Sequence, residues 1–236
     1  MPENLLKGKV GIITGALDEN SIAWKTALKA KEQGAKFVLT NAPIAMRMGA
    51  INELAKECDT IVIPNIRKGR SYGELNYDWL NKSYDVSAIS FHKMMHVAEK
   101  MDVMKEWGSI VGLSYIAAQR VFPFYTDMAD AKALLESIAR GYGYRFGKLK
   151  KVRVNTISQS PTKTTAGTGI GGFDSFFNFA EALSPLGNAS ADACADYIVT
   201  MFSDLTKMVT MQNLFHDGGY SFTGISEDIM EKFKDL

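Results

Sequence analysis

The chain of 236 residues is 46% hydrophobic and 22% charged, which is enough to fill the core of one large α/β domain and excludes a disordered chain. Its formal net charge of +1 provides no field that would by itself hold nucleic acid or an anionic membrane. No segment approaches the roughly 18 consecutive apolar residues of a membrane span, so we expect small-molecule chemistry.

The N-terminal part of the chain predicts a βαβ unit. The apolar run Val10–Ile13 predicts a strand, and a long helical pattern from Ser21 to Gln33 predicts the helix that follows it. Gly34 ends this helix as a C-terminal glycine commonly does. The second strand is Lys36–Thr40.

The loop between the first strand and the first helix suits a dinucleotide. Gly15 directly follows the strand, where a glycine lets the backbone approach a pyrophosphate, and the next helix offers unpaired N–H groups at its N-terminus. Gly15, Ser21 and Ile22 would line such a site. Because the loop lacks the three-glycine fingerprint, an ordinary turn stays open as the alternative.

The residues after the second strand favour NADH as the cofactor. Asn41, Ala42 and Pro43 offer no acidic group for the ribose hydroxyls and no adjacent base for a 2′-phosphate. Arg47 lies a few residues further on, which leaves NADPH open.

The alternating pattern then breaks at position 64/65. A helix at Arg47–Cys58 and a strand at Thr60–Ile63 are followed directly by the polar stretch 65–70, where a doubly wound sheet needs a crossover helix and a fourth strand. We therefore expect that one βα unit is missing at this point, either because the chain has lost it or because this sequence omits residues that the molecule contains.

The rest of the chain returns to alternation. The expected elements are helices at Leu75–Tyr84, Val86–Lys105 and Tyr125–Phe146, and strands at Ser109–Leu113, Val152–Ile157 and Gln212–Gly219. Four glycines within residues 167–172 predict a mobile loop. We predict one domain over residues 1–236, with a Rossmann-type doubly wound parallel sheet and helices on both faces.

Tyr115, Tyr125 and Lys132 are the candidate catalytic residues. Tyr125 and Lys132 are seven residues apart, almost two helical turns, so they project from one face of a helix. Tyr115 leaves the end of the preceding strand toward the same site. Met128 occupies the position four residues before the lysine where carbonyl reductases of this fold place a tyrosine, which disfavours carbonyl reduction. The alternative is that the tyrosines pack the core and Lys132 faces solvent.

This set suits hydride addition to a carbon–carbon double bond conjugated with a thioester. The addition leaves negative charge on the thioester oxygen, and a phenol is a hydrogen-bond donor for it. Lys132 can hold the nicotinamide ribose while its charge favours the developing enolate.

Two other clusters carry weaker signals. His92 and His96 are four residues apart on one helical face, but no third ligand is set by the sequence, so we expect no metal. The basic run Lys148–Lys151 is expected to be solvated, although an acidic carrier protein could use it.

The chain resembles the short-chain dehydrogenase/reductase superfamily, and within it the type I enoyl-[acyl-carrier-protein] reductases. The motifs that carry the resemblance are Thr14-Gly15 with Ser21-Ile22-Ala23, Leu113-Ser114-Tyr115, the spacing of Tyr125 and Lys132 around Met128, Val152–Asn155 with Ser160-Pro161-Thr162, and Asp217-Gly218-Gly219. The family carries a further helix and strand where this pattern breaks, roughly 50 residues by the dimensions of a βαβ unit.

The resemblance implies a role for each matching residue. Tyr125 and Tyr115 would contact the enoyl thioester next to Met128, and Lys132 would hold the nicotinamide ribose. The implied cofactor contacts are Gly15, Ser21 and Ile22 at the pyrophosphate, Ala42 near the adenosine, and Thr162, Lys163, Thr164, Thr165 and Ala166 over the nicotinamide. A flexible substrate-binding loop would span about 164–179. The resemblance further implies NADH, an acyl carrier protein as partner, and a homotetramer.

Two other functions stay open from the sequence. One is a non-catalytic, reductase-like module that keeps oligomerisation or carrier binding, which the break at 64/65 favours. The other is a related reductase acting on different enones or carbonyls. Cys58 and Cys194 lie far apart with no pairing pattern, which fits a reducing compartment and a cytoplasmic enzyme.

Overall fold

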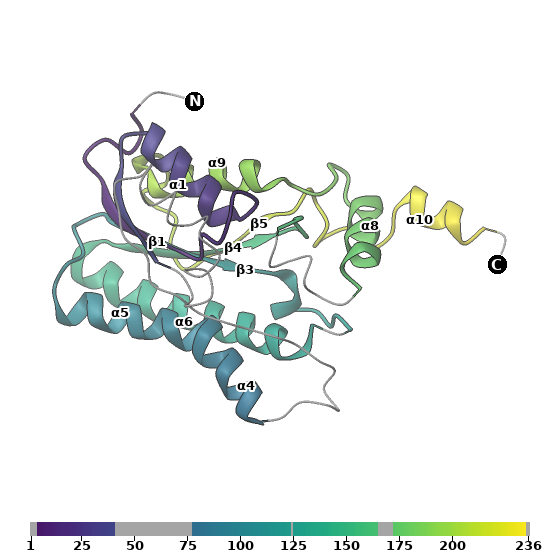
Figure 1. Ribbon diagram of the computed structural model, residues 1–236, viewed down its shortest axis with the longest axis horizontal. Helices are drawn as coiled ribbons and strands as arrows, with labels where there is room; N and C mark the ends of the chain where they lie inside the picture. The colour runs from purple at the N-terminus through teal and green to yellow at the C-terminus, as the bar shows by residue number, and fades with distance from the viewer. Residues whose placement is uncertain (1–3, 41–76, 124, 165–171, 235–236) are drawn as a thin grey trace.

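The computed structural model describes residues 4–40, 77–123, 125–164 and 172–234, in which strands alternate with helices along the chain (Figure 1). The expected helix at Arg47–Cys58, the strand at Thr60–Ile63 and the break at 64/65 lie outside the described residues. None of the helices in the described part combines the length and hydropathy needed to cross a bilayer.

The described strands form two parallel sheets. β1 (Val10–Thr14) pairs with β2 (Lys36–Thr40), with Val10 opposite Lys36. The second sheet has the order β3-β4-β5 and contains β3 (Ser109–Ser114), β4 (Arg153–Gln159) and β5 (Asn213–His216). All these pairs are parallel, as the βαβ reading predicts.

Helices α1 (Ile22–Glu32) and α9 (Ala191–Phe202) form one layer over the sheets (Figure 1). Each begins at a serine whose hydroxyl accepts a backbone N–H of the first turn. The two helices also exchange ion pairs, with Lys29 Nζ 2.7 Å from Asp196 Oδ1. Val199 of α9 completes the core cluster of α1, β1 and β2, so this contact joins the first sheet to the second.

The opposite layer contains α4 (Tyr77–Tyr84), the π-helical segment η2 (Asp85–Ile89), α5 (Ser90–Lys100) and the long helix α6 (Thr126–Lys150). The sequence predicts a helix through Lys105, but α5 ends at Lys100 because Asp102 takes a left-handed conformation with φ 52°. Helix α6 extends beyond the predicted Phe146, and Lys151 ends it with φ 56°.

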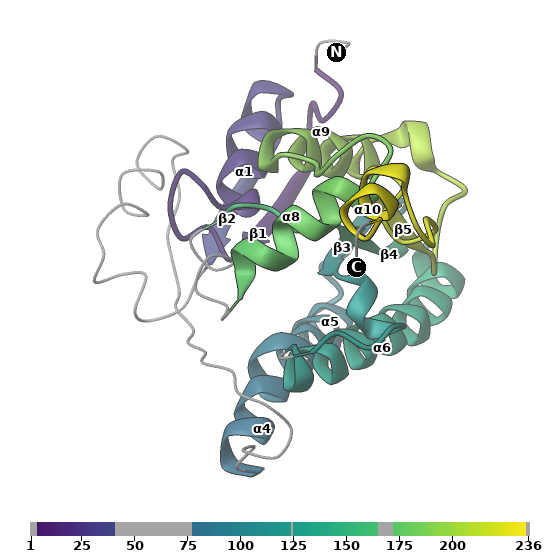
Figure 2. The same ribbon diagram turned by 90° about the vertical axis from the view of Figure 1, so that its right-hand side faces the viewer.

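Several short elements lie at the carboxyl ends of the strands. They are the 3₁₀ turn η3 (Ile116–Ala118) and the helices α8 (Phe173–Leu183) and α10 (Glu227–Lys232), whereas the 3₁₀ turn η4 (Asp204–Thr206) follows α9. Figure 2 shows α8 and α10 in front of the strand ends. Residues 165–171 lie outside the described part, and residues 173–179, expected within a substrate loop, form the first turns of α8.

β1 has one strand neighbour within the described residues. In the described residues it forms a ladder with β2 alone, and no ladder joins it to β3. Val10 and Ile12 are 80% and 63% exposed, whereas every residue of β4 is buried. Among the described residues, no strand pairs with the edge of β1 that faces away from β2.

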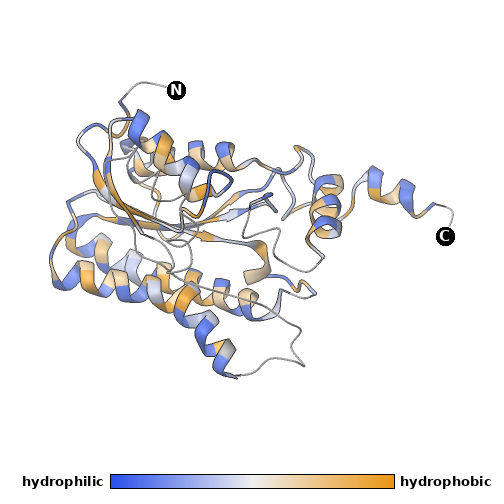
Figure 3. Ribbon diagram, in the orientation of Figure 1, coloured by the Kyte–Doolittle hydropathy of each residue, from blue (hydrophilic) through white to orange (hydrophobic). Residues whose placement is uncertain are grey.

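The interior of the second sheet contains a buried arginine. Figure 3 shows mainly apolar colours along β3 and η3, yet Arg153 of β4 is only 2% exposed. Its guanidinium donates to the carbonyl oxygens of Met201 at 3.1 Å, Ser203 at 3.0 Å and Thr206 at 2.9 Å. Burial lowers the pKa of Arg153. The arginine thus pairs carbonyls that the end of α9 leaves without a helical partner.

Arg153→Met should lower the free energy of unfolding by about 3 kcal/mol, because three carbonyls would each lose a charged donor, and the Met201 carbonyl would keep only Ser109 and Thr206 as donors. Urea denaturation measures this loss. Arg145→Met is the control, since Arg145 is an exposed partner of Glu99 and an exposed ion pair contributes about 1 kcal/mol or less. Equal losses in the two variants would show that the buried arginine has no special role.

Candidate active site

Strand β3 and helix α6 bring Tyr115, Tyr125 and Lys132 to one place. Tyr115 directly follows β3 in extended conformation, and Tyr125 is the N-cap residue of α6. Their rings meet edge to face with centroids 5.2 Å apart. Lys132 donates from Nζ to the carbonyl oxygen of Leu113 at 2.6 Å. Two phenols and one ammonium therefore gather at the carboxyl end of β3, where ligands bind in open α/β sheets.

The Tyr115 hydroxyl is buried without a hydrogen-bond partner. The residue is 6% exposed, and no group makes a hydrogen bond of acceptable geometry with its oxygen. Burial is the first cause that raises the pKa of Tyr115, and the phenols of Tyr220 and Tyr125 and the Asp217 carboxylate raise it further. A buried hydroxyl without a partner is costly, so this protonated phenol is suited to donate to a ligand.

Aromatic rings surround the two phenols. Phe176 of α8 contacts the Tyr115 ring edge to face with centroids 5.7 Å apart, and Phe122 lies 5.2 Å from the same ring. Tyr220 belongs to the same buried cluster. This apolar wall keeps water from the Tyr115 hydroxyl, which strengthens any hydrogen bond that this hydroxyl makes.

A buried carboxylate lies beneath the site. Glu136 of α6 is four residues after Lys132, on the same helical face, and accepts from Ser114 Oγ at 2.6 Å and from Gln119 Nε2 at 3.2 Å. These bonds hold the end of β3 against α6 on either side of Tyr115. The sequence interpretation did not include Glu136, although its spacing from Lys132 carries the signal.

The first loop has the expected strand–glycine–helix geometry. Gly15 takes a positive φ of 87° that favours glycine, and its N–H donates to the Thr40 carbonyl at 2.8 Å. The Ser21 hydroxyl accepts from Trp24 N and donates to the Asp18 carbonyl. Ile22 opens α1 and packs against the core cluster of Ile157. The loop thus presents the N-terminus of α1 at the carboxyl end of β1.

The expected nicotinamide segment is described only in part. Thr162 donates from Oγ1 to the Ser160 carbonyl at 3.0 Å and accepts from Gln159 Nε2. The Lys163 ammonium lies 4.6 Å from the centroid of the Phe177 ring, and Thr164 N donates to the Thr162 carbonyl. The structure does not describe Ala42, Thr165 or Ala166.

Met128 is buried on the side of α6 that faces η2. Its sulfur accepts from Ser87 Oγ at 3.5 Å. Met128, which stands where carbonyl reductases of this fold place a tyrosine, therefore contacts η2 through its thioether.

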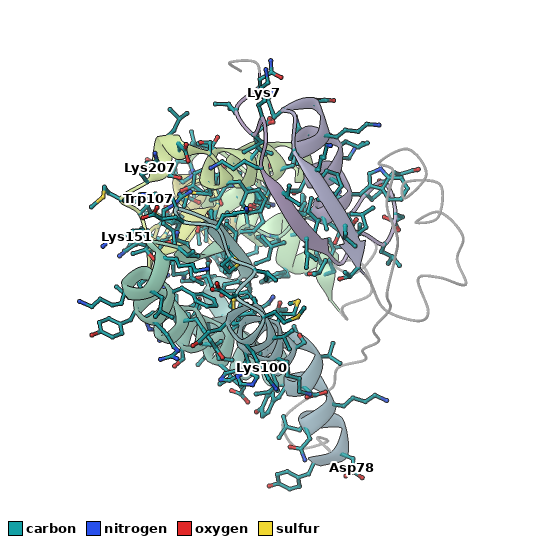
Figure 4. All side chains as sticks on the ribbon, turned by 90° about the vertical axis from the view of Figure 1, so that its left-hand side faces the viewer. Lys7, Asp78, Lys100, Trp107, Lys151 and Lys207 are labelled. Atoms are coloured by element: carbon teal, nitrogen blue, oxygen red, sulfur yellow. The ribbon has the colours of Figure 1, made fainter. Side chains whose placement is uncertain are left out.

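The weaker sequence clusters lie elsewhere. His92 packs edge to face on Tyr142 with centroids 5.1 Å apart, beside a hollow of about 540 Å³ between α5 and α6. Lys148 is 16 residues beyond Lys132 on α6, a distance of about 24 Å along the helix axis. Figure 4 shows Lys151, Trp107 and Lys207 near one another, and Lys207 Nζ lies 5.6 Å from the Trp107 ring centroid. This basic run is therefore remote from the phenols.

Comparisons with known proteins agree with this geometry. A family model described as enoyl-(acyl carrier protein) reductase matches residues 63–221. The chain belongs to the enoyl-(acyl carrier protein) reductase family. A curated relative, the NADH enoyl-[acyl-carrier-protein] reductase FabI of Rickettsia conorii, is 30% identical over 95% of this chain and 98% of its own. A crystal structure of the FabI–NADH complex from Alistipes finegoldii is 52% identical, with a TM-score of 0.92 over 99% of this chain and 97% of that one.

The alignment with the Rickettsia enoyl-[acyl-carrier-protein] reductase also shows a difference in length. It runs over 258 residues, more than the 236 residues of this chain. The relative therefore contains residues that have no counterpart in this chain.

Proposed function

We propose that this protein reduces the trans-2 double bond of an enoyl thioester on acyl carrier protein with NADH, in fatty acid elongation. The observation that carries the proposal is the meeting of Tyr115, Tyr125 and Lys132 at the carboxyl end of β3. The relatives named as NADH-dependent FabI proteins and the FabI–NADH complex support NADH and the reaction class.

The residues of this site fit the cofactor and the reaction. When bound, NADH supplies a hydride to the β-carbon of the enoyl group. The electron pair of the double bond then moves toward the thioester oxygen, and Tyr125 donates a hydrogen bond to that oxygen as its charge grows. Tyr115, whose hydroxyl has no other partner, is placed to donate as well. A proton at the α-carbon completes the saturated thioester.

The remaining proposed contacts surround the phenols. Lys132 binds the nicotinamide ribose, and its charge stabilises the enolate. The cofactor contacts proposed from the family are Gly15, Ser21, Ile22, Ala42, Thr162, Lys163, Thr164, Thr165 and Ala166. The N-terminus of α1 offers unpaired N–H groups to the pyrophosphate. The homotetramer and the cytoplasmic location are expectations of the same proposal.

The experiment mixes the protein with NADH and a crotonyl or longer enoyl thioester and follows the loss of nicotinamide absorbance. Thermal unfolding with and without NADH is measured in parallel, because a ligand that binds only the folded state raises the melting temperature. We expect turnover and a higher melting temperature. No turnover and no shift would contradict the enzyme.

The break expected at position 64/65 favours a second candidate, the non-catalytic module that binds a carrier or a second copy. Without a central strand, the ladders of β1 and β3 each stay open, at a cost comparable to the whole stability of a domain, about 5–15 kcal/mol. If the protein is such a module, it should bind a carrier protein, and NADH should not raise its melting temperature. The turnover and thermal unfolding measurements therefore separate the two candidates.

We also propose that the functional molecule contains a further βα unit between β2 and β3, whose strand fills the position between β1 and β3. The intact mass of the protein isolated from its source should then exceed the 26.0 kDa of this sequence by about 3 kDa or more, since a βαβ unit has about 30 residues or more. A mass near 26.0 kDa would contradict this proposal and support the non-catalytic module as the function.

A further inference from the structure

Tyr220 places a third phenol in the aromatic cluster of the site. It is 4% exposed, shares a core cluster with Tyr115, and its ring centroid lies 6.2 Å from that of Phe122, which also contacts Tyr115. Burial is the largest cause that raises the pKa of Tyr115, and the interaction with the Tyr220 phenol is the second. Neither the nicotinamide contacts nor the thioester contacts proposed above include Tyr220.

A rigid turn fixes the position of Tyr220. Gly218 and Gly219, which precede it, take positive φ angles of 64° and 93°. The Asp217 carboxylate accepts from Gly219 N and Ser221 N at 3.0 Å each, and Tyr220 N donates to the Asp217 carbonyl at 3.1 Å. The backbone on both sides of Tyr220 is therefore held by one aspartate.

The same turn is docked on the segment that follows α8. Leu186 N donates to the Gly218 carbonyl at 3.1 Å, and the backbone at Gly218 leaves no room for a Cβ beside the Gly187 carbonyl. Tyr220 consequently has little freedom to move away from the cluster, whereas Tyr115 presents a buried hydroxyl that lacks a partner.

We propose that Tyr220 is a positioning residue of the reductase, whose hydroxyl holds the Tyr115 phenol in the orientation that donates to the thioester oxygen beside Tyr125. This inference rests on the proposed function. In the proposed contact the Tyr220 hydroxyl donates to the Tyr115 oxygen, which leaves the Tyr115 proton for the thioester oxygen. Tyr220 itself touches neither the reacting carbons nor the cofactor.

The test is a double-mutant cycle with saturating NADH. Tyr220→Phe should lower kcat about three- to tenfold, the value of one hydrogen bond, and leave the Kd of NADH unchanged. In a Tyr115→Phe background the same substitution should lower kcat no further, because the phenol that it positions is gone. Tyr142→Phe, outside this cluster on α6, is the control and should leave kcat unchanged.

Two outcomes would overturn the positioning role: an equal loss of kcat in both backgrounds, or a change of melting temperature in Tyr220→Phe with no change of kcat. A second measurement does not depend on turnover. In NMR spectra of protein labelled with ¹³C at the tyrosine ζ-carbon, the Tyr115 signal should move in Tyr220→Phe. If the Tyr115 signal did not move, the contact between Tyr115 and Tyr220 would be contradicted, even if the wild type proved inactive. If the signal moved but the wild type showed no turnover, only the proposed function would be contradicted.

Discussion

Lys132→Ala is expected to weaken NADH binding and turnover together. The ammonium is held against the Leu113 carbonyl at 2.6 Å, two residues before Tyr115, and its proposed role is to bind the nicotinamide ribose. Alanine removes hydrogen bonds from a charged donor, which contribute about 1.5–3 kcal/mol each, so the Kd of NADH should rise about ten- to hundredfold. Isothermal titration with NADH and steady-state kinetics measure the two effects.

Lys100→Ala provides the matched control for this variant. Lys100 is an exposed lysine at the end of α5, and it borders the hollow between α5 and α6 rather than the phenols. Its removal should leave both the Kd of NADH and kcat unchanged. Equal NADH affinity in the wild type and in Lys132→Ala would refute the role assigned to Lys132.

Tyr125→Phe is expected to lower kcat about 10²- to 10³-fold with little change in NADH affinity. The ring remains in contact with Tyr115, but the donor for the thioester oxygen is lost, and removing one such donor costs about 2.7–4 kcal/mol of transition-state stabilisation. Single-turnover kinetics with NADH and an enoyl thioester would measure the loss in the chemical step directly.

Tyr144→Phe is the control for Tyr125→Phe because Tyr144 is an exposed tyrosine on the same helix, α6. It should retain wild-type kcat. If Tyr125→Phe also retained wild-type kcat, the donor to the thioester oxygen would be another group, and Tyr115 would be the first candidate.

The local pattern of the sequence predicts much of this fold. The strand, glycine and helix around Gly15 are observed with boundaries within one residue, as are β2 and the start of β3. These elements are predictable because apolar period and turn residues act over a few neighbouring positions. The seven-residue spacing of Tyr125 and Lys132 is predictable for the same reason, since both residues belong to the start of one helix.

Features that depend on contacts between distant segments were not predictable in this way. Phe176 joins the site because α8 folds over the strand ends, and Tyr220 joins it because the turn after β5 docks near α8. Glu136 differs from Phe176 and Tyr220 because the sequence does contain a signal for it, its spacing of four residues from Lys132. Its partner Ser114, however, lies on another element. The missing βα unit expected at position 64/65 stays a prediction, because residues 41–76 lie outside the described part of the chain.

The central claim is that two phenols and one ammonium guide a hydride onto an enoyl thioester. Its most direct test is a reaction with NADH deuterated at the transferred position, followed by mass spectrometry and NMR of the product. The account predicts a saturated thioester with one deuterium at the β-carbon. Deuterium on a former carbonyl carbon, or an enoyl thioester recovered unlabelled from a reaction in which NADH binds, would contradict it.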